Sequence, residues 1–173
     1  MADPTPPAPP SHVVQRNTPE FAEALRNAFK ETPLHKLLDL EFIQIDDEMI
    51  IIEMPVAQNA LNSGGNLHGG AIATLIDVAA GTAAAHNSSF VPGENTIVTA
   101  DMHVRYLGRA KGSKVRAEAQ VMRAGRQLVV VECRVNDEDG RMIAFADFAS
   151  MVVPYRDPLP IAGGDAKPES PDL

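Results

Sequence analysis

The alternation of apolar and polar residues in the second half of the chain predicts strands of an antiparallel sheet with one face on a core. Segments 114–121 and 127–135 place apolar residues at every second position. These are Val115, Ala117, Ala119 and Val121 in the first segment, and Val129, Val131, Cys133 and Val135 in the second. Residues 137–140 (DEDG) predict a hairpin turn, after which 141–153 returns as a last strand.

Segment 96–106 predicts a further strand of the same sheet. Counting by twos assigns its apolar residues to one face and its polar residues to the other: Val98, Ala100, Met102 and Val104 against Thr99, Asp101, His103 and Arg105. On this interpretation Thr99 points away from the apolar face of its own strand. We expect His103 and Arg105 on an outer or oligomeric face.

The first half of the chain predicts mainly helix and two shorter strands. Residues 18–30 form a predicted helix, because Thr18 can cap it and apolar residues recur at a spacing of four. A short helical turn is expected from Thr32-Pro33 to Leu38, followed by strands at about 39–46 and 49–56. Residues 57–69 read as a polar, glycine-containing loop.

The segment from Gly70 to about His86 (GAIATLIDVAAGTAAAH) sets the predicted architecture. Its alanine content favours a helix, and it is apolar around nearly its whole circumference. Such a helix is buried on almost all sides. One antiparallel sheet curled around one long central helix satisfies this order of elements, so the predicted fold class is α+β.

Both ends of the chain differ in composition from this core. Residues 1–17 are rich in proline, and 156–173 are rich in Pro, Gly and Asp. Segments of this kind bury too little apolar surface to offset their ordering entropy. We therefore expect flexible tails at 1–17 and 156–173, with one folded domain at 18–155.

Charge and cysteine content exclude several classes of protein. The 23 acidic residues outnumber the 15 basic ones, and the net charge of -8 argues against nucleic-acid binding. Cys133 is the only cysteine, so neither an intramolecular disulfide nor a thiolate-rich zinc site is possible. The apolar run 71–85 contains Asp77 and is too short to span a bilayer. With no signal-peptide pattern apparent, we expect a cytoplasmic protein without membrane partners.

Asp77 is the anomaly of the central helix, because an acid in an apolar segment is costly to bury unless it is paired or used. It could equally be a surface acid, or a core acid satisfied by backbone donors. His68-Gly69-Gly70 directly precedes the helix, whose first backbone amides lack intrahelical partners and can bind an oxyanion. Gly69 lies eight residues before Asp77, about 12 Å along the axis. A symmetric dimer would bring the two groups together across subunits.

These residues resemble a known family. Asn62, the His68-Gly69-Gly70 triplet and Asp77 have the spacing of the PaaI-like branch of hotdog-fold acyl-CoA thioesterases, within the 4-hydroxybenzoyl-CoA thioesterase-type superfamily. The resemblance continues through 99–102 (TADM), Tyr106 and 123–126 (RAGR), and covers about residues 33–153. It implies a hotdog fold and the hydrolysis of an acyl-CoA thioester to free acid and coenzyme A.

The resemblance also implies a role for each of these residues. Asp77 is the general base or nucleophile, and the Gly69 amide forms the oxyanion hole. Asn62 helps to hold the attacking water or the thioester group, Thr99 supports the water, and His68 shapes the loop. The coenzyme A arm would lie near the following residues: Gly70, Tyr106, Arg123, Gly125 and Arg126. Simpler alternatives stay open, with Asn62 as a turn residue, His68 as a loop residue bonded to backbone, Thr99 as structural, and the two arginines as a solvated hairpin.

No metal or separate cofactor is expected, since thioester hydrolysis needs a base and oxyanion stabilisation, and coenzyme A is part of the substrate. We expect a homo-oligomer, a dimer at minimum and more specifically a dimer of dimers (a homotetramer). Two other functions compete with the thioesterase. One is a hotdog hydratase or dehydratase, and the other is a non-catalytic acyl-CoA-binding or sensor module.

Overall fold

The computed structural model describes residues 26–27, 29–46, 48–91 and 94–156. Residues 26–27 and 29–31 are helical, and the rest of the helix predicted from Thr18 lies outside the described residues. Helix α2 (Pro33–Leu38) follows, with proline in its first turn, and ends at Asp39, whose φ is 52°. The segments predicted as tails also lie outside the described residues, except for Arg156 at the edge of the second.

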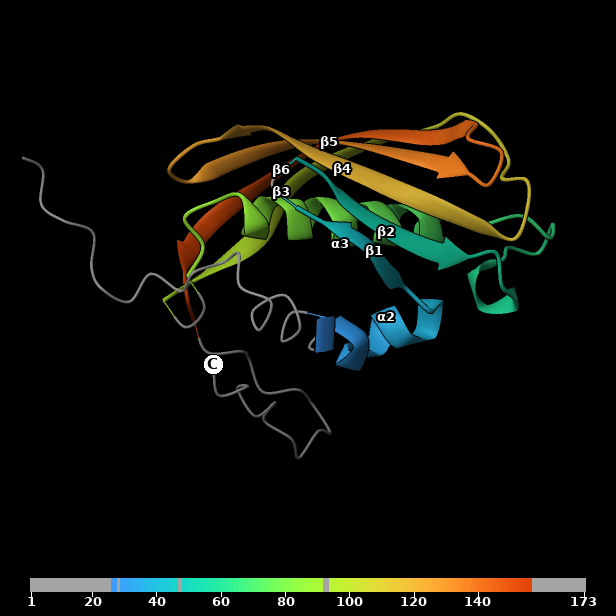
Figure 1. The fold of residues 1–173 in the computed structure, drawn as a ribbon, viewed down its shortest axis with the longest axis horizontal. Coiled ribbons are helices and arrows are strands. Elements are labelled where there is room, and N and C mark those ends of the chain that lie inside the picture. The colour runs from blue at the N-terminus through green and yellow to red at the C-terminus, as the bar shows by residue number, and fades with distance from the viewer. Residues whose placement is uncertain (1–25, 28, 47, 92–93, 157–173) are drawn as a thin grey trace, which may run out of the picture.

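Six strands form one antiparallel sheet in the order β1-β2-β4-β5-β6-β3 (Figure 1). Their bounds are β1 (Glu41–Ile45), β2 (Ile50–Pro55), β3 (Asn95–Tyr106), β4 (Lys114–Ala124), β5 (Leu128–Asp137) and β6 (Met142–Pro154). β1 and β3 are therefore the two edges. The turn predicted at 137–140 joins β5 to β6, and Gly140 has the positive φ of 77° that favours glycine there.

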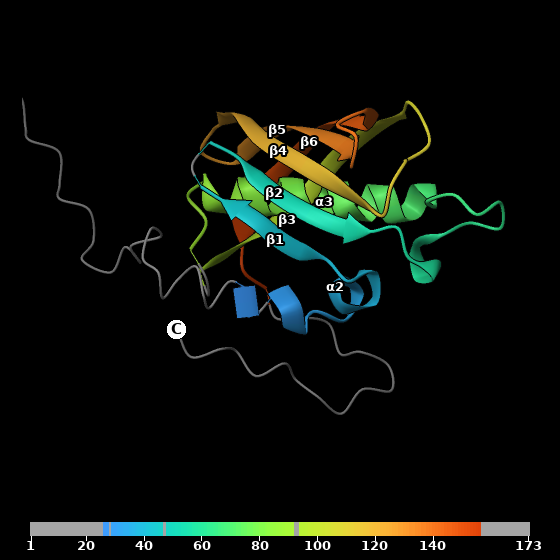
Figure 2. The ribbon, with the colours of Figure 1, turned by 45° about the vertical axis from the view of Figure 1, so that its right-hand side comes forward.

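Helix α3 (Gly69–His86) lies against the concave face of this sheet, between the strands and α2 (Figures 1 and 2). It begins one residue before the predicted start, at Gly69. One side of α3 is fully covered by the strands, and its residues there are Ala71, Ile72, Leu75, Ile76, Ala79, Ala80, Ala83 and Ala84. The small side chains in this set let the helix backbone approach the sheet closely. A sheet wrapped around one central helix confirms the predicted fold class.

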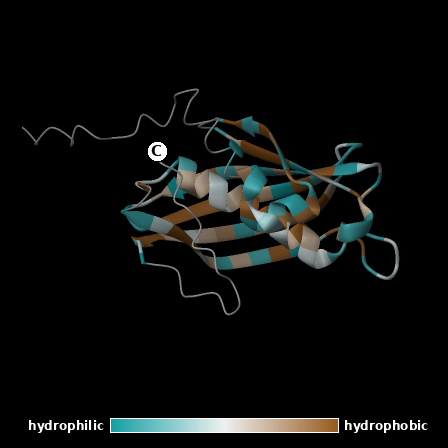
Figure 3. Cartoon of the chain, turned by 90° about the horizontal axis from the view of Figure 1, so that it is seen from below, coloured by the Kyte–Doolittle hydropathy of each residue, from teal (hydrophilic) through white to brown (hydrophobic). Residues whose placement is uncertain are grey.

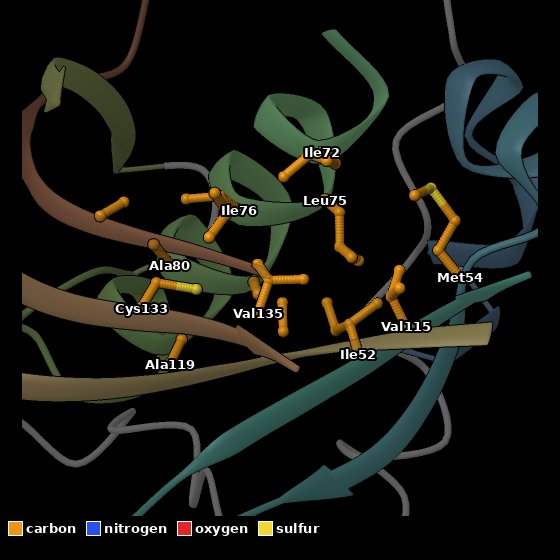
Figure 4. Packing of buried hydrophobic residues seen from close by; sticks show 14 of the residues in the cluster. Ile52, Met54, Ile72, Leu75, Ile76, Ala80, Val115, Ala119, Cys133 and Val135 are labelled. Atoms are coloured by element: carbon orange, nitrogen blue, oxygen red, sulfur yellow. The ribbon is translucent and has the colours of Figure 1, made fainter. Parts of the chain in front are cut away.

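The core lies between α3 and the inner faces of β2, β4, β5 and β6 (Figure 4). The alternation predicted for β4 and β5 is confirmed, because Val115, Ala117, Val131 and Val135 are almost completely buried. Cys133 lies in the same layer, and its burial raises the pKa of its thiol to about 12. The thiol is therefore protonated and inert at neutral pH.

The prediction for the faces of β3 is wrong in the first half of the strand. Thr99 pairs with Ser150 of β6, but the next pair is Asp101 with Ala149, so Ala100 is an extra, bulged residue. A bulge reverses the side on which the preceding residues lie, because side chains alternate with a strict period of two. Thr99 consequently faces α3 together with Met102, whereas Val98 is 41% exposed.

The prediction that α3 is buried on almost all sides holds for only one side of it within a single chain. The opposite stripe is only half-buried, and it consists of Ala73, Thr74, Asp77, Val78, Gly81, Thr82 and Ala85. In the view from below, α3 lies in front of the strands, and both hydrophobic and hydrophilic residues occur along it (Figure 3). The helix thus has more apolar surface than the rest of a single chain buries.

Candidate active site along the central helix

The helix begins in a loop that His68 and Asn62 hold together. The Gly70 amide donates to Nδ1 of His68 over 2.9 Å, and the His68 amide donates to the carbonyl of Ala60 over 2.8 Å. His68 is therefore the N-cap of α3. Because Nδ1 accepts, the neutral ring carries its proton on Nε2. His68 has the backbone-bonded loop position that the sequence left open as an alternative, which is compatible with shaping the loop.

Asn62 uses its side-chain oxygen to close this loop. Oδ1 accepts from the amides of Gly64 at 2.9 Å and Asn66 at 3.2 Å, and the backbone of Asn62 also pairs with Asn66. This is an Asx-type turn, the simpler of the two roles considered from the sequence. The Nδ2 amide of Asn62 is the part of the side chain that could donate to a ligand.

Gly69 is the first residue of α3, so its amide belongs to the turn whose N–H groups have no acceptor within the helix. The hydroxyl of Tyr106 donates to the Gly69 carbonyl over 3.0 Å. A Cβ atom at position 69 would lie 3.4 Å from Cζ of Tyr106, and one at position 70 would lie 3.1 Å from Nδ1 of His68. Position 70 is therefore tight for a side chain, whereas a Cβ at position 69 would make ordinary contact with the Tyr106 ring, whose hydroxyl steadies the helix start.

Asp77 lies midway along α3 on its half-buried stripe. The hydroxyl of Thr99 donates to Oδ1 of Asp77 over 2.8 Å. This contact exists because the bulge at Ala100 turns Thr99 towards the helix. Asp77 is therefore held by a side chain of the neighbouring strand, an arrangement that neither simpler interpretation of the sequence included.

Arg123, Gly125 and Arg126 lie at the other end of α3 from Gly69. The carbonyl of Arg126 accepts from the hydroxyl of Ser89, three residues beyond the last helical residue. Eighteen helical residues correspond to about 27 Å. Gly125 belongs to the β4–β5 turn, where its amide donates to the Leu128 carbonyl over 2.8 Å. One chain therefore brings Tyr106 and Gly70 to Gly69, but not the two arginines.

Ser150 is a polar residue of the inner face that is not among the predicted site residues. It alternates with Phe148 and Val152 on β6, so the same count by twos that identified β4 and β5 marks it as inward-facing. It is completely buried and lies opposite Thr99 in the β3–β6 ladder. The pairing of strands, which the sequence does not reveal, is what places it beside Thr99.

Within the described ranges, no group of three or more His, Cys, Asp or Glu side chains is arranged to hold a metal ion. In the same part of the chain, no helix has both the length and the apolar character needed to cross a membrane. The expectation of metal-free chemistry stays a prediction.

An antiparallel sheet curled around one central helix is the architecture of hotdog-fold proteins. Comparisons with known proteins place the chain among them. Residues 64–144 match the family model described as Thioesterase superfamily. A putative esterase of Halobacterium salinarum is 33% identical over 107 residues, which cover 58% of this chain and 70% of that protein. Acyl-coenzyme A thioesterase 13 of Mus musculus is 28% identical over 130 residues, covering 73% and 90% respectively. A crystal structure of a mutant thioesterase from Pseudomonas aeruginosa aligns with a TM-score of 0.70 at 26% identity, covering 76% of this chain and 94% of its own.

The chain therefore belongs to the thioesterase superfamily and has its hotdog fold. Its reaction class is the hydrolysis of thioesters.

Proposed function

We propose that this protein hydrolyses acyl-CoA thioesters to a free acid and coenzyme A, with Asp77 as general base or nucleophile and the Gly69 amide as oxyanion hole. The observation that carries the proposal is the position of Asp77. Its carboxylate is held by Thr99 on the uncovered stripe of a helix whose first turn presents the Gly69 amide. The mouse relative, which is named as an acyl-coenzyme A thioesterase, supports the choice of thioester.

The chemistry requires two groups, and both are available. As water attacks the thioester carbonyl, Asp77 takes its proton, and negative charge develops on the carbonyl oxygen. A backbone N–H aimed at that oxygen stabilises the charge without having to reorganise. Collapse of the intermediate breaks the carbon–sulfur bond, and the leaving coenzyme A sulfur takes up the proton that Asp77 accepted. In the nucleophilic variant, Asp77 attacks the thioester carbonyl and displaces the coenzyme A thiolate, and water then hydrolyses the acyl–carboxyl anhydride to the free acid and the Asp77 carboxylate.

The proposal includes a homodimer, because Gly69 and Asp77 of one chain are about 12 Å apart along the helix. Two features of the single chain support it. The half-buried stripe of α3 is richer in small and apolar residues than a solvated helix face, and β3 is an unpaired edge of the sheet. A second copy that covers both would place Asp77 of one chain near the partner's Gly69. A dimer of dimers is the assembly that we propose for the full protein.

We assign the phosphates of coenzyme A to Arg123 and Arg126. Both side chains are exposed, and guanidinium groups bind phosphate by paired hydrogen bonds. Because they lie far from Gly69 of their own chain, the phosphates bound at one site would meet the arginines of the partner subunit. Tyr106 and Gly70, which flank Gly69, would line the pantetheine end of the same site.

The test is a coenzyme A release assay with a thiol reagent on a panel of aryl, short, medium and long acyl-CoAs. We expect release from at least one class at a rate well above the uncatalysed rate. The panel also identifies the acyl group that the enzyme prefers. Binding of acyl-CoA without release would instead indicate a sensor module. Hydration of an enoyl-CoA without free thiol would indicate a hydratase.

A further inference from the structure

Ser150 has a buried hydroxyl beside the Asp77–Thr99 pair. Its side chain is completely buried, and among the described residues its Oγ has no hydrogen-bond partner. Buried hydroxyls without a partner are rare, because the hydroxyl loses its hydrogen bonds to water on folding. Ser150 is the one serine of β6, and it lies at the level of Thr99. Two other inward positions of the strand, Ala144 and Ala146, are alanine.

The neighbours of Ser150 within the sheet include one polar side chain. Along β6 it lies between Phe148 and Val152, and across the β5 ladder its partner is Val129, all of them buried and apolar. Across the β3 ladder its partner is Thr99. Thr99 is the polar side chain among these four, so it is the neighbour to which the Ser150 hydroxyl can donate.

The geometry of the ladder allows this bond. Direct partners on one face of an antiparallel pair have Cβ atoms about 4.5–5.5 Å apart, and serine–threonine hydrogen bonds across strands are a common use of that spacing. A serine hydroxyl moves among three positions by rotation about χ1. Thr99 already donates its proton to Asp77, which leaves the lone pairs of its oxygen to accept.

We propose that Ser150 is a positioning residue for the reaction, donating to Oγ1 of Thr99, which donates in turn to Oδ1 of Asp77. Each hydrogen bond in such a chain strengthens the next, and the chain holds the carboxylate in one orientation. Ser150 touches neither substrate nor reacting atoms and acts through Thr99. This inference rests on the proposed function of Asp77.

The test is a double-mutant cycle of Ser150→Ala and Thr99→Ala, read in kcat and in the pH profile of kcat/KM. Loss of one hydrogen bond predicts that Ser150→Ala lowers kcat by about threefold to tenfold with little change in KM. In the Thr99→Ala background the same change should cost less than about twofold. The low-pH limb of the profile should move to higher pH in both single variants, and further in Thr99→Ala. Thr99→Ala removes the donor to the Asp77 carboxylate, whereas Ser150→Ala only weakens that donor, and a carboxylate with a lost or weaker donor is protonated more readily.

Val129→Ala is the matched control, since it truncates the buried residue on the other side of Ser150. It should lower the Tm and leave the low-pH limb unmoved. The proposal is overturned if Ser150→Ala keeps the wild-type kcat and pH profile, or if its effect is the same with and without Thr99.

The cycle is also measured in the free energy of unfolding, which needs no turnover. Non-additive losses for Ser150→Ala and Thr99→Ala establish the hydrogen bond, and additive losses refute it. If the wild-type protein released no coenzyme A from any substrate, the proposed function and the positioning role would fall together. The coupling in stability would still decide whether Ser150 bonds to Thr99.

Discussion

Thr99 and Asp77, 22 residues apart in the chain, are joined by a hydrogen bond of 2.8 Å between the threonine hydroxyl and Oδ1 of the acid. The contact links the edge strand β3 to the centre of α3. It depends on one extra residue, Ala100, which turns Thr99 to the inner face. A carboxylate oriented in this way on a half-buried helix stripe is the centre of the proposed catalytic site.

Replacing Asp77 by Asn keeps size and hydrogen-bonding capacity but removes the base. We expect kcat to fall by about a hundredfold or more, the usual range for an acid–base group. Binding of coenzyme A, measured by calorimetry, should change little. Asn62→Ala should lose less activity, because its side chain positions groups and does not react. Near wild-type turnover by Asp77→Asn would show that the acid is structural.

The two-chain site predicts complementation between two inactive variants. Gly69→Val places a side chain against the ring of Tyr106, where even a Cβ atom would lie 3.4 Å from Cζ. Co-expressed with Asp77→Asn under separate tags, it forms mixed dimers in which one of the two sites is intact. Random pairing of subunits predicts about a quarter of wild-type activity. Each variant alone is the control, and no recovery in purified mixed dimers would place both groups in one chain.

Activity should survive exhaustive chelation, because a carboxylate and a backbone amide suffice for thioester hydrolysis. The measurement is the rate of coenzyme A release before and after dialysis against EDTA. Readdition of Mg²⁺, Mn²⁺ or Zn²⁺ serves as the control. Loss of turnover that a single divalent ion restores would contradict a metal-free mechanism.

The thiol of Cys133 should be unreactive in the folded protein. Its burial raises the pKa from 9.0 to about 12, so little thiolate exists at pH 8. The pKa of this thiol is higher in the folded state than in the unfolded state. Its contribution to the stability of the fold is therefore fully present below pH 9 and is lost as the pH rises from about 9 towards 12. Labelling with a thiol reagent at pH 8 should therefore require denaturant. Rapid labelling of the native protein would contradict the buried position.

Asp137 should stabilise the β5–β6 turn in a pH-dependent way. Its burial raises the pKa of its carboxyl, but hydrogen bonds from the amides of Arg141, Lys111 and Asp139 outweigh this and lower the pKa from its usual value of 3.8. The stabilisation is present above about pH 4 and is lost as the pH falls through the lowered value. Asp137→Asn should lower the Tm at pH 7, with a difference that shrinks below pH 4.

Asp139→Asn in the same exposed turn is the control for this measurement. Its Tm should follow the wild-type protein across the pH range. A constant difference between Asp137→Asn and wild type from pH 7 to pH 3 would exclude the ionised carboxylate as the cause.

The sequence by itself determined the elements and most of the core. Period-two alternation identified β4 and β5 because both strands are regular and have one buried face, as Val115 and Val131 illustrate. The alanine-rich segment that ends at His86 could only be a helix packed against other elements. The spacing of Gly69 and Asp77 along a helix of fixed rise is the basis of the prediction that a second chain completes the site, and this stays a prediction.

Tertiary structure alone decided which side chains meet. Nothing in the letters around Ala100 distinguishes a bulge from a regular strand, since the extra residue is defined by its pairing with β6. The bulge turns Thr99 towards Asp77, and the order of strands places Ser150 next to Thr99. The position of Arg126 relative to Gly69, at the opposite end of α3, could likewise not be predicted from their spacing along the chain. Local periodicity indicates which residues of a strand share a face. Which residues are neighbours across the sheet depends on the register of the strands, and this is set by packing over the whole fold.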